Sequence, residues 1–229
     1  MRRRANPAWL FVAPALGAIA LFLFVPVFAS LLLSFTDFDI YAVAELRNLR
    51  FVGLANYQTL LAEPLFWQAL RNTLYFVAVG GPLSVAASLA AALLVNARLA
   101  RCRPLFRTAF FLPVVTTLVA IAVVWRYLYH PRIGLVNHVL GLAGVAPVDW
   151  LGDPLWAMPA LILLAVWKGF GFNMVIFVAG LQGIPEKLYE AARLDGANAW
   201  QQLRHVTLPQ LAPTAFFVAV MTMIGSLQL

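Results

Sequence analysis

One basic residue, Lys168, lies in the middle of a long apolar stretch, with Asn173 a little over one helical turn further on. An ammonium group at the centre of a membrane costs about 2.5–3.5 kcal/mol on insertion scales, so it should face protein or water. A lysine and an amide in this position could bind an anionic or hydroxyl-rich solute on a translocation pathway. The alternative, which we favour, is a structural lysine that snorkels or donates to neighbouring carbonyl groups.

Signatures of enzymes and metal sites are missing from the sequence. It contains no GxxxxGK[ST] phosphate loop, no HExxH, no GxSxG and no cluster of carboxylates within a span. His130 and His138 have no carboxylate at helical spacing, and the single cysteine, Cys102, excludes an internal disulfide and a cysteine-based zinc cluster. We therefore expect no catalytic residue, no metal site and no cofactor on this chain.

The polar segment at residues 184–213 carries most of the local signals for structure. Pro185 suits the first position of a helix, and Glu186 follows in the first turn, where a carboxylate stabilises the positive end of the helix dipole. Good helix formers continue to Asp195. Gly196 can then adopt the left-handed conformation that ends a helix.

A second short helix is expected after this glycine. Asn198 can cap it, with Gln201 as the partner in a capping box. Pro209 disfavours the helical conformation of Leu208, so this helix should end there. The segment is thus predicted to be two short helices joined by a glycine turn.

The same segment has a fixed order of residues: Glu190-Ala191-Ala192, three residues, Gly196, nine residues, and Val206-Thr207-Leu208-Pro209. This order resembles the EAA loop of ABC importer permeases. The surrounding sequence, IPEKLYEAARLDGA and RHVTLPQLAP, is similar to that of the sugar-type branch, which serves oligosaccharides and glycerol-3-phosphate. The alternative is an ordinary loop between membrane helices. Flanking apolar spans exclude a DNA-reading helix-turn-helix, and we expect no nucleic-acid partner.

The resemblance implies that residues 181–210 form a cytoplasmic coupling loop that seats on an ATP-hydrolysing subunit. The residues of this contact would be Glu190, Ala191, Ala192 and Gly196, with Glu186 and Asp195 as polar contacts and Leu208-Pro209 setting the angle to the next helix. Two ATP-binding subunits would hold ATP and magnesium. A second permease, usually a different chain, and an extracytoplasmic binding protein would complete an importer that moves a sugar or related polyol by alternating access.

The composition is that of an integral membrane protein, since 63% of the residues are hydrophobic and 11% charged, against about 25% charged in soluble domains. Apolar runs predict helical spans in one transmembrane domain over residues 1–229. They lie at about 10–33, 72–95 (with a kink at Gly80-Gly81-Pro82), 108–129, 155–180 and, incomplete, 211–229. The result is an all-α polytopic bundle, for which the resemblance implies the type I importer permease (MetI-like) fold. That branch normally has six spans, so we expect a C-terminal part to be lacking here.

Charge predicts the orientation in the membrane. With a cytoplasmic N-terminus, six of the nine acidic residues are outside and ten of the sixteen basic residues inside: Arg2, Arg3, Arg4, Arg98, Arg101, Arg103, Arg107, Lys187, Arg193 and Arg204. Such an excess of basic residues in inner loops sets topology. We expect a multi-pass protein in the lipid bilayer of a bacterial-type cell (inner) membrane. A secondary transporter is the alternative, but it would need inverted repeats, and the two halves show no convincing similarity.

Overall fold

The structure, a computed structural model, describes residues 8–38, 49–96 and 103–228. Regular secondary structure in these ranges is helical throughout, apart from one isolated antiparallel bridge between Thr36 and Phe51. The predicted all-α class is therefore confirmed. The N-terminal arginines, and Arg98, Arg101 and Cys102 of the basic loop, lie outside the described ranges.

The described residues form two compact units that divide after Ala69. In the first unit, an apolar helix is followed by the short helix α3; its elements are α1 (Ala8–Ile19), η1 (Ala20–Phe24), α2 (Val25–Leu33) and α3 (Ala55–Ala62). The turn after α2 is fastened to α3, because Asn56 Nδ2 donates to the carbonyl oxygens of Ser34 at 2.9 Å and Thr36 at 2.8 Å. Helix α4 (Pro64–Tyr75) begins at a proline and leads into the second unit.

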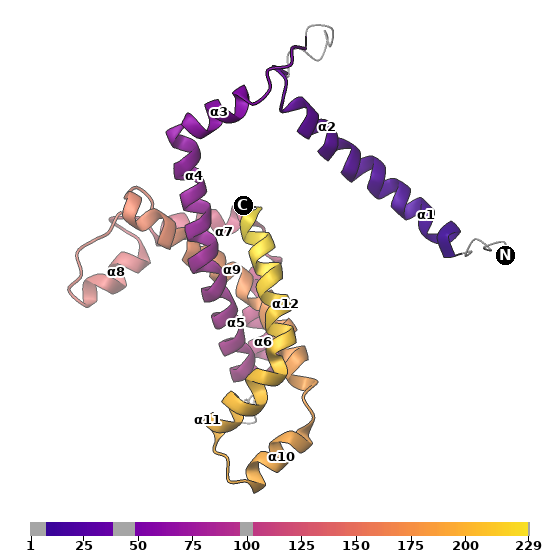
Figure 1. Cartoon of the computed structure of the whole chain (residues 1–229). Coiled ribbons are helices and arrows are strands. Elements are labelled where there is room, and N and C mark those ends of the chain that lie inside the picture. Colours follow the sequence, from indigo (N-terminus) through magenta and orange to yellow (C-terminus); the bar gives the residue numbers. More distant parts are fainter. Residues whose placement is uncertain (1–7, 39–48, 97–102, 229) are drawn as a thin grey trace, which may run out of the picture. The chain divides into compact units, whose positions relative to one another are not determined.

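The second unit is built around one long helix, α9 (Pro154–Gln182), which packs against α5 (Gly81–Asn96), α6 (Arg103–Val115) and α12 (Leu208–Leu227) (Figure 1). The core between α5, α9 and α12 contains fully buried side chains from each helix: Ala92, Met174, Phe177, Leu211 and Val218. The remaining elements are η4 (Phe76–Gly80), α7 (Leu118–Leu128), α8 (Leu135–Leu142), α10 (Glu186–Leu194), α11 (Ala199–Gln202) and η5 (Leu203–Thr207).

Helix α9 begins at a well-defined cap. Asp153 accepts a hydrogen bond from the Leu155 N–H at 2.9 Å, and Pro154 occupies the first helical position, where no N–H is needed. The helix has 29 residues, which gives a length of about 43 Å, enough to cross a hydrocarbon core of about 30 Å.

In the part of the chain that the structure describes, four helices are long and apolar enough to cross a membrane: Phe11–Leu33, Pro64–Asn96, Pro154–Gln182 and Ala199–Leu227. A fifth candidate is the pair Pro104–Val115 and Leu118–Leu128, which is bent by 100° at the intervening residues. Where the sequence predicts one span at about 108–129, the structure therefore has two helices with a sharp bend between them. Thr117 adopts an extended backbone with ψ 143°, and the Thr116 hydroxyl donates to the Leu112 carbonyl, so the two threonines interrupt the helix.

The predicted helix end at Leu208 is wrong. Leu208 is helical, with φ −62° and ψ −43°, and the chain stays helical from α11 through η5 into α12. The reason is the π-helical turn η5, in which the Leu208 N–H donates to the carbonyl of Leu203, five residues back. This wider turn precedes Pro209, so the residue that cannot donate an N–H follows a segment whose hydrogen bonds are already shifted.

Next to the predicted kink at Gly80-Gly81-Pro82, the structure has another π-helical turn. Residues 76–80 form η4, after which α5 begins at Gly81, and the whole stretch Pro64–Asn96 passes as one candidate span. A proline two residues after the turn is thus accommodated without ending the helix.

The close packing of α6 on α9 depends on Gly171. A Cβ atom at this position would collide with the Phe110 carbonyl oxygen, whereas a Cβ at Gly169 would have no neighbour within 4 Å. We expect Gly171→Ala to lower the thermal unfolding midpoint of the purified protein, because overpacking typically costs about 1–3 kcal/mol. Gly169→Ala is the matched control and should retain the midpoint. Equal midpoints for the two variants would contradict this account of the interface.

Candidate functional site

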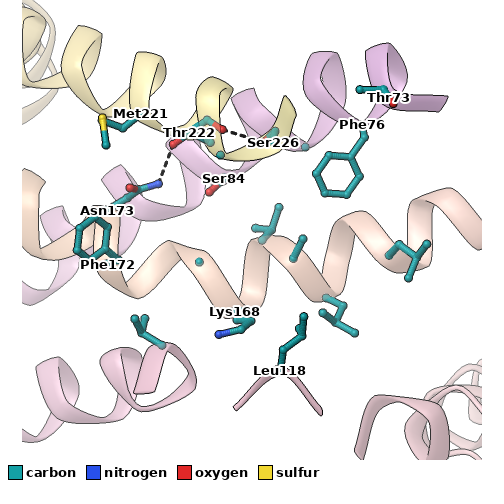
Figure 2. Close-up of a pocket in the computed structure, with 18 of the residues that line it drawn as sticks. Thr73, Phe76, Ser84, Leu118, Lys168, Phe172, Asn173, Met221, Thr222 and Ser226 are labelled. Atoms are coloured by element: carbon teal, nitrogen blue, oxygen red, sulfur yellow. Dashed lines mark hydrogen bonds between the residues drawn. The ribbon is translucent and has the colours of Figure 1, made fainter. Parts of the chain in front are cut away.

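A cavity of about 730 Å³ lies within the second unit, between η4, the α6–α7 break, α9 and α12 (Figure 2). Most of its wall is apolar, with side chains such as Phe76, Leu118, Phe172 and Met221. The polar lining comes from amides, hydroxyls and one ammonium group, on Asn72, Thr73, Ser84, Lys168, Asn173, Thr222 and Ser226. None of the described residues that line the cavity carries a carboxylate.

Lys168 and Asn173, the two residues singled out in the fourth predicted span, both line this cavity, but they form hydrogen bonds with different elements. Asn173 is buried, and its Nδ2 donates to Thr222 Oγ1 at 3.0 Å, on α12. Lys168 Nζ donates instead to the Thr116 carbonyl at the α6–α7 break, at 3.4 Å. In Figure 2 the two side chains leave opposite sides of the α9 ribbon.

Sequence reasoning missed the polar groups that α12 contributes to the cavity. Thr222 accepts from Asn173, and Ser226 Oγ donates to the Thr222 carbonyl at 2.8 Å. Small hydroxyl residues are common in membrane helices, so their mere presence is a weak signal. Their spacing of four residues, which puts both on one helix face, is the feature that could have identified them.

At one end of the second unit, α10 and α11 form the predicted pair of short helices around a glycine turn (Figure 1). Gly196 has φ +79°, and Asn198 and Gln201 form the expected reciprocal capping box. Both local predictions are confirmed. Pro185, predicted at the first helical position, lies one residue earlier, as the cap of α10.

The residues proposed for ATPase coupling lie on or beside this helix pair. Glu186, Glu190, Ala191, Asp195 and Gly196 are exposed. Ala192 is half-buried, and Leu208 and Pro209 are exposed at the start of α12. Arg193 donates to Glu186 at 3.0 Å, which makes an ion pair along the outer side of α10. Exposed ion pairs of this kind contribute little to stability.

Two large apolar side chains on the helix pair escaped the sequence reasoning. Leu194 is 90% exposed and Trp200 is 65% exposed. They flank the Gly196 turn, and polar residues such as Arg193, Asp195 and Asn198 surround them in the sequence. Exposed apolar groups rimmed by polar residues are typical of surfaces that contact another protein.

A second polar segment, residues 130–153, lies next to the start of α9 and is organised by the buried amide of Asn137. Its Nδ2 donates to the carbonyls of Pro131 at 3.1 Å and Val148 at 2.8 Å. Its Oδ1 accepts from the Val148 N–H at 3.2 Å and from Trp150 Nε1 at 2.9 Å. Stacking of Trp150 on Tyr129 and the bond from Tyr129 Oη to the Ala160 carbonyl, at 3.0 Å, fasten this segment to α9.

Within residues 8–38, 49–96 and 103–228, no three side chains of His, Cys, Asp or Glu gather as a metal ion would require. His130 has a local role: its Nδ1 accepts from the backbone N–H groups of Arg132 at 3.2 Å and Ile133 at 3.3 Å.

Comparisons with known proteins agree with this geometry. Residues 84–229 match the family described as "Binding-protein-dependent transport system inner membrane component". The chain is 38% identical to the lactose transport system permease protein LacF of Rhizobium radiobacter, over 96% of this chain and 72% of that protein. It is 33% identical to the trehalose/maltose transport system permease protein MalF of Thermococcus litoralis, over 99% and 75% respectively.

Solved structures give the same picture. A bacterial ABC transporter involved in the import of the acidic polysaccharide alginate matches with a TM-score of 0.75 at 27% identity, over 96% of this chain and 74% of that one. The alginate ABC transporter in complex with its alginate pentasaccharide-bound periplasmic protein matches with a TM-score of 0.74 at 26% identity, over 94% and 70%.

The role of Asn137 can be tested by removing its amide. Asn137→Leu keeps a side chain of similar size but leaves two N–H groups and two carbonyls without this partner, and a buried unsatisfied group costs about 1–3 kcal/mol. We expect limited proteolysis within residues 130–153 to become several-fold faster. His138→Ala, an exposed neighbour, is the control. Equal cleavage rates in both variants would show that the amide does not organise the segment.

Proposed function

The chain belongs to the family of binding-protein-dependent transport system inner membrane components and is a permease subunit of an ABC importer, and we propose that it moves a sugar or a related polyol. Support for the solute class comes from the relatives, whose names specify lactose and trehalose/maltose, and from the alginate importer. The cavity is compatible with such solutes, because apolar walls suit the C–H faces of a sugar ring, and amides and hydroxyls can exchange hydrogen bonds with its hydroxyl groups.

The observation that carries the coupling role is the exposed turn between α10 and α11. It presents Leu194 and Trp200 beside the small residues Ala191 and Gly196, where another protein can approach closely. We assign this turn to a groove on an ATP-binding subunit. The contact would include Glu190, Ala191, Ala192 and Gly196, with Glu186 and Asp195 as polar contacts and Leu208-Pro209 at the junction with α12.

ATP hydrolysis is then the task of separate subunits. In the proposed complex, two ATP-binding subunits hold ATP and magnesium, and this chain contributes neither a cofactor nor a catalytic group. Closure of the ATP-binding subunits would displace the α10–α11 turn, and with it α12. Alternating access of the cavity to the two sides of the membrane would follow.

The remaining partners are assigned to the two faces of the membrane. The α10–α11 turn would be cytoplasmic, together with the N-terminus, as the distribution of basic residues suggests. Residues 130–153 would face the other side, where a solute-binding protein delivers the sugar, by analogy with the periplasmic protein in the alginate complex. A second permease, a different chain, would complete the pathway.

The coupling role is tested by replacing Gly196, whose φ of +79° is unfavourable for a β-branched residue. Such a conformation costs of the order of 1–3 kcal/mol, so the turn should rearrange. We expect Gly196→Val to insert normally into the membrane but to abolish solute-stimulated ATP hydrolysis by the assembled complex. Unchanged hydrolysis would exclude this turn from coupling.

A second test is co-purification with the ATP-binding subunit, for which the structure offers a control glycine in the same conformation. Gly144 has φ +80° and, like Gly196, no atom within 4 Å of a Cβ, but it follows α8 in the segment at residues 130–153. Gly144→Val should still co-purify with the ATP-binding subunit. The double substitution Glu190→Arg and Ala191→Arg should lose that subunit, because bulky cations then occupy the proposed contact.

The cavity is tested at Thr222, which lines it beside Asn173. Thr222→Val preserves the shape but removes the hydroxyl that accepts from Asn173. We expect the KM for uptake of a sugar by the reconstituted complex to rise about tenfold. Loss of one hydrogen bond of about 1.4 kcal/mol between the sugar and this pair of side chains would produce such a change. Met221→Leu, an apolar substitution in the same wall, should leave KM nearly unchanged. The same KM in both variants would remove this hydroxyl from the pathway.

A further inference from the structure

Lys168 has a defined partner, and that partner is a backbone group. Its Nζ donates to the carbonyl oxygen of Thr116, which lies in the break between α6 and α7, where the chain turns by 100°. Figure 2 shows the ammonium on the same side of α9 as Leu118, the first residue of α7, and away from Thr222 on α12.

The break creates a need for donors. A helix leaves its last four carbonyl groups without N–H partners, and lipid offers no water to replace them. At the end of α6, side chains supply two donors: the Thr116 hydroxyl donates to the Leu112 carbonyl at 3.1 Å, and Lys168 donates to the Thr116 carbonyl. A cation is also favourable at this end of a helix, because the helix dipole is negative there.

The packing of α6 on α9 brings these groups together. Phe110 contacts Gly171 through its carbonyl and Phe170 through its ring, with ring centroids 5.6 Å apart. The helices run in opposite directions, so Thr116 lies about 9 Å beyond this contact and Lys168 about 4.5 Å beyond it in the same direction. The long lysine stem spans the remainder. Gly171, which tolerates no side chain, therefore fixes the register of the two helices. This register places the ammonium of Lys168 at the break between α6 and α7, which we call the corner.

We propose that Lys168 is a positioning residue, whose ammonium holds the corner between α6 and α7 and thereby the cavity wall that carries Val114 and Leu118. Its charge is directed to a backbone carbonyl and does not recognise a charge on the solute. The consequence for transport rests on the proposed function, since it requires the cavity to be the solute pathway. The role of Lys168 in holding the corner does not depend on the proposed function.

The corner can be measured directly in the assembled importer by the distance between two spin labels, on a Cys102→Ser background. Leu105 on α6 and Tyr127 on α7 are 67% and 66% exposed, so each can carry a label after replacement by cysteine. In a straight helix their Cα atoms would be about 33 Å apart, whereas a 100° bend brings them to about 20 Å. We expect a narrow distribution near the shorter distance in the parent protein.

Lys168→Met removes the donor while retaining the apolar stem, and we expect the distribution to broaden toward longer distances. Lys168→Arg, which can still donate to the carbonyl, should restore the narrow distribution. If Lys168→Met fails to insert, Lys168→Gln replaces it in the comparison. The glutamine side chain is too short to reach Thr116, so this variant should also broaden the distance distribution. An unchanged distribution in the variant that inserts would overturn the proposal.

Uptake by the reconstituted complex separates positioning from recognition of charge, with lactose as the neutral probe and an alginate oligosaccharide as the acidic probe. We expect Lys168→Met to reduce the maximal rate without a selective rise in KM for the acidic probe. A selective rise of tenfold or more would overturn the proposal in favour of a solute-binding lysine. Failure of the parent complex to transport either probe would count against the proposed function, while the distances would still decide the role of Lys168.

Discussion

The constraint on which this structure depends is that each backbone carbonyl within the membrane needs a donor from the protein. Proline makes this harder, because it lacks an N–H for the carbonyl four residues back. All three π-helical turns in the described residues end two positions before a proline: η1 before Pro26, η4 before Pro82 and η5 before Pro209. In η1 and η5 the residue before the proline donates five residues back, to Ala20 and Leu203. The wider turn thus lets a helix continue past a proline.

The cavity lies where this regularity is broken. Phe76 and Gly80 belong to η4, and Val114 and Leu118 lie on either side of the α6–α7 break. Irregular backbone at membrane depth is tolerated where it is buried in protein or lines a cavity. The long helix α9 supplies the opposite kind of surface, because Gly171 and Gly180 leave room for neighbouring helices to pack closely. A long central helix and irregular neighbours together produce a defined cavity with a few polar groups.

Sequence predicted the short-range features well. The glycine turn at Gly196 and the capping box of Asn198 and Gln201 depend on residues within a few positions of one another, so spacing alone specifies them. The partners of Lys168 and Asn173 are 52 and 49 residues away, and no local pattern encodes such pairs. The continuation of the helix at Pro209 was missed for a related reason. The residue before a proline locally disfavours the helical conformation, but at Leu208 a π-helical turn overrides this preference. We did not predict that turn from the sequence.

This continuation has a mechanical meaning. If the chain had bent freely at Leu208, movement of the α10–α11 turn would have been absorbed at that joint. Instead, residues Ala199–Leu227 form one helical element, which carries Trp200 near the exposed turn and Thr222 in the cavity wall. Their separation of 22 residues corresponds to about 33 Å along the helix axis. The hydrogen bond between Tyr189 Oη and Thr207 Oγ1, at 3.0 Å, also fastens α10 to η5, directly before α12. In the proposed function, a displacement imposed on the turn would therefore be passed along this continuous helical element to the polar groups of the cavity.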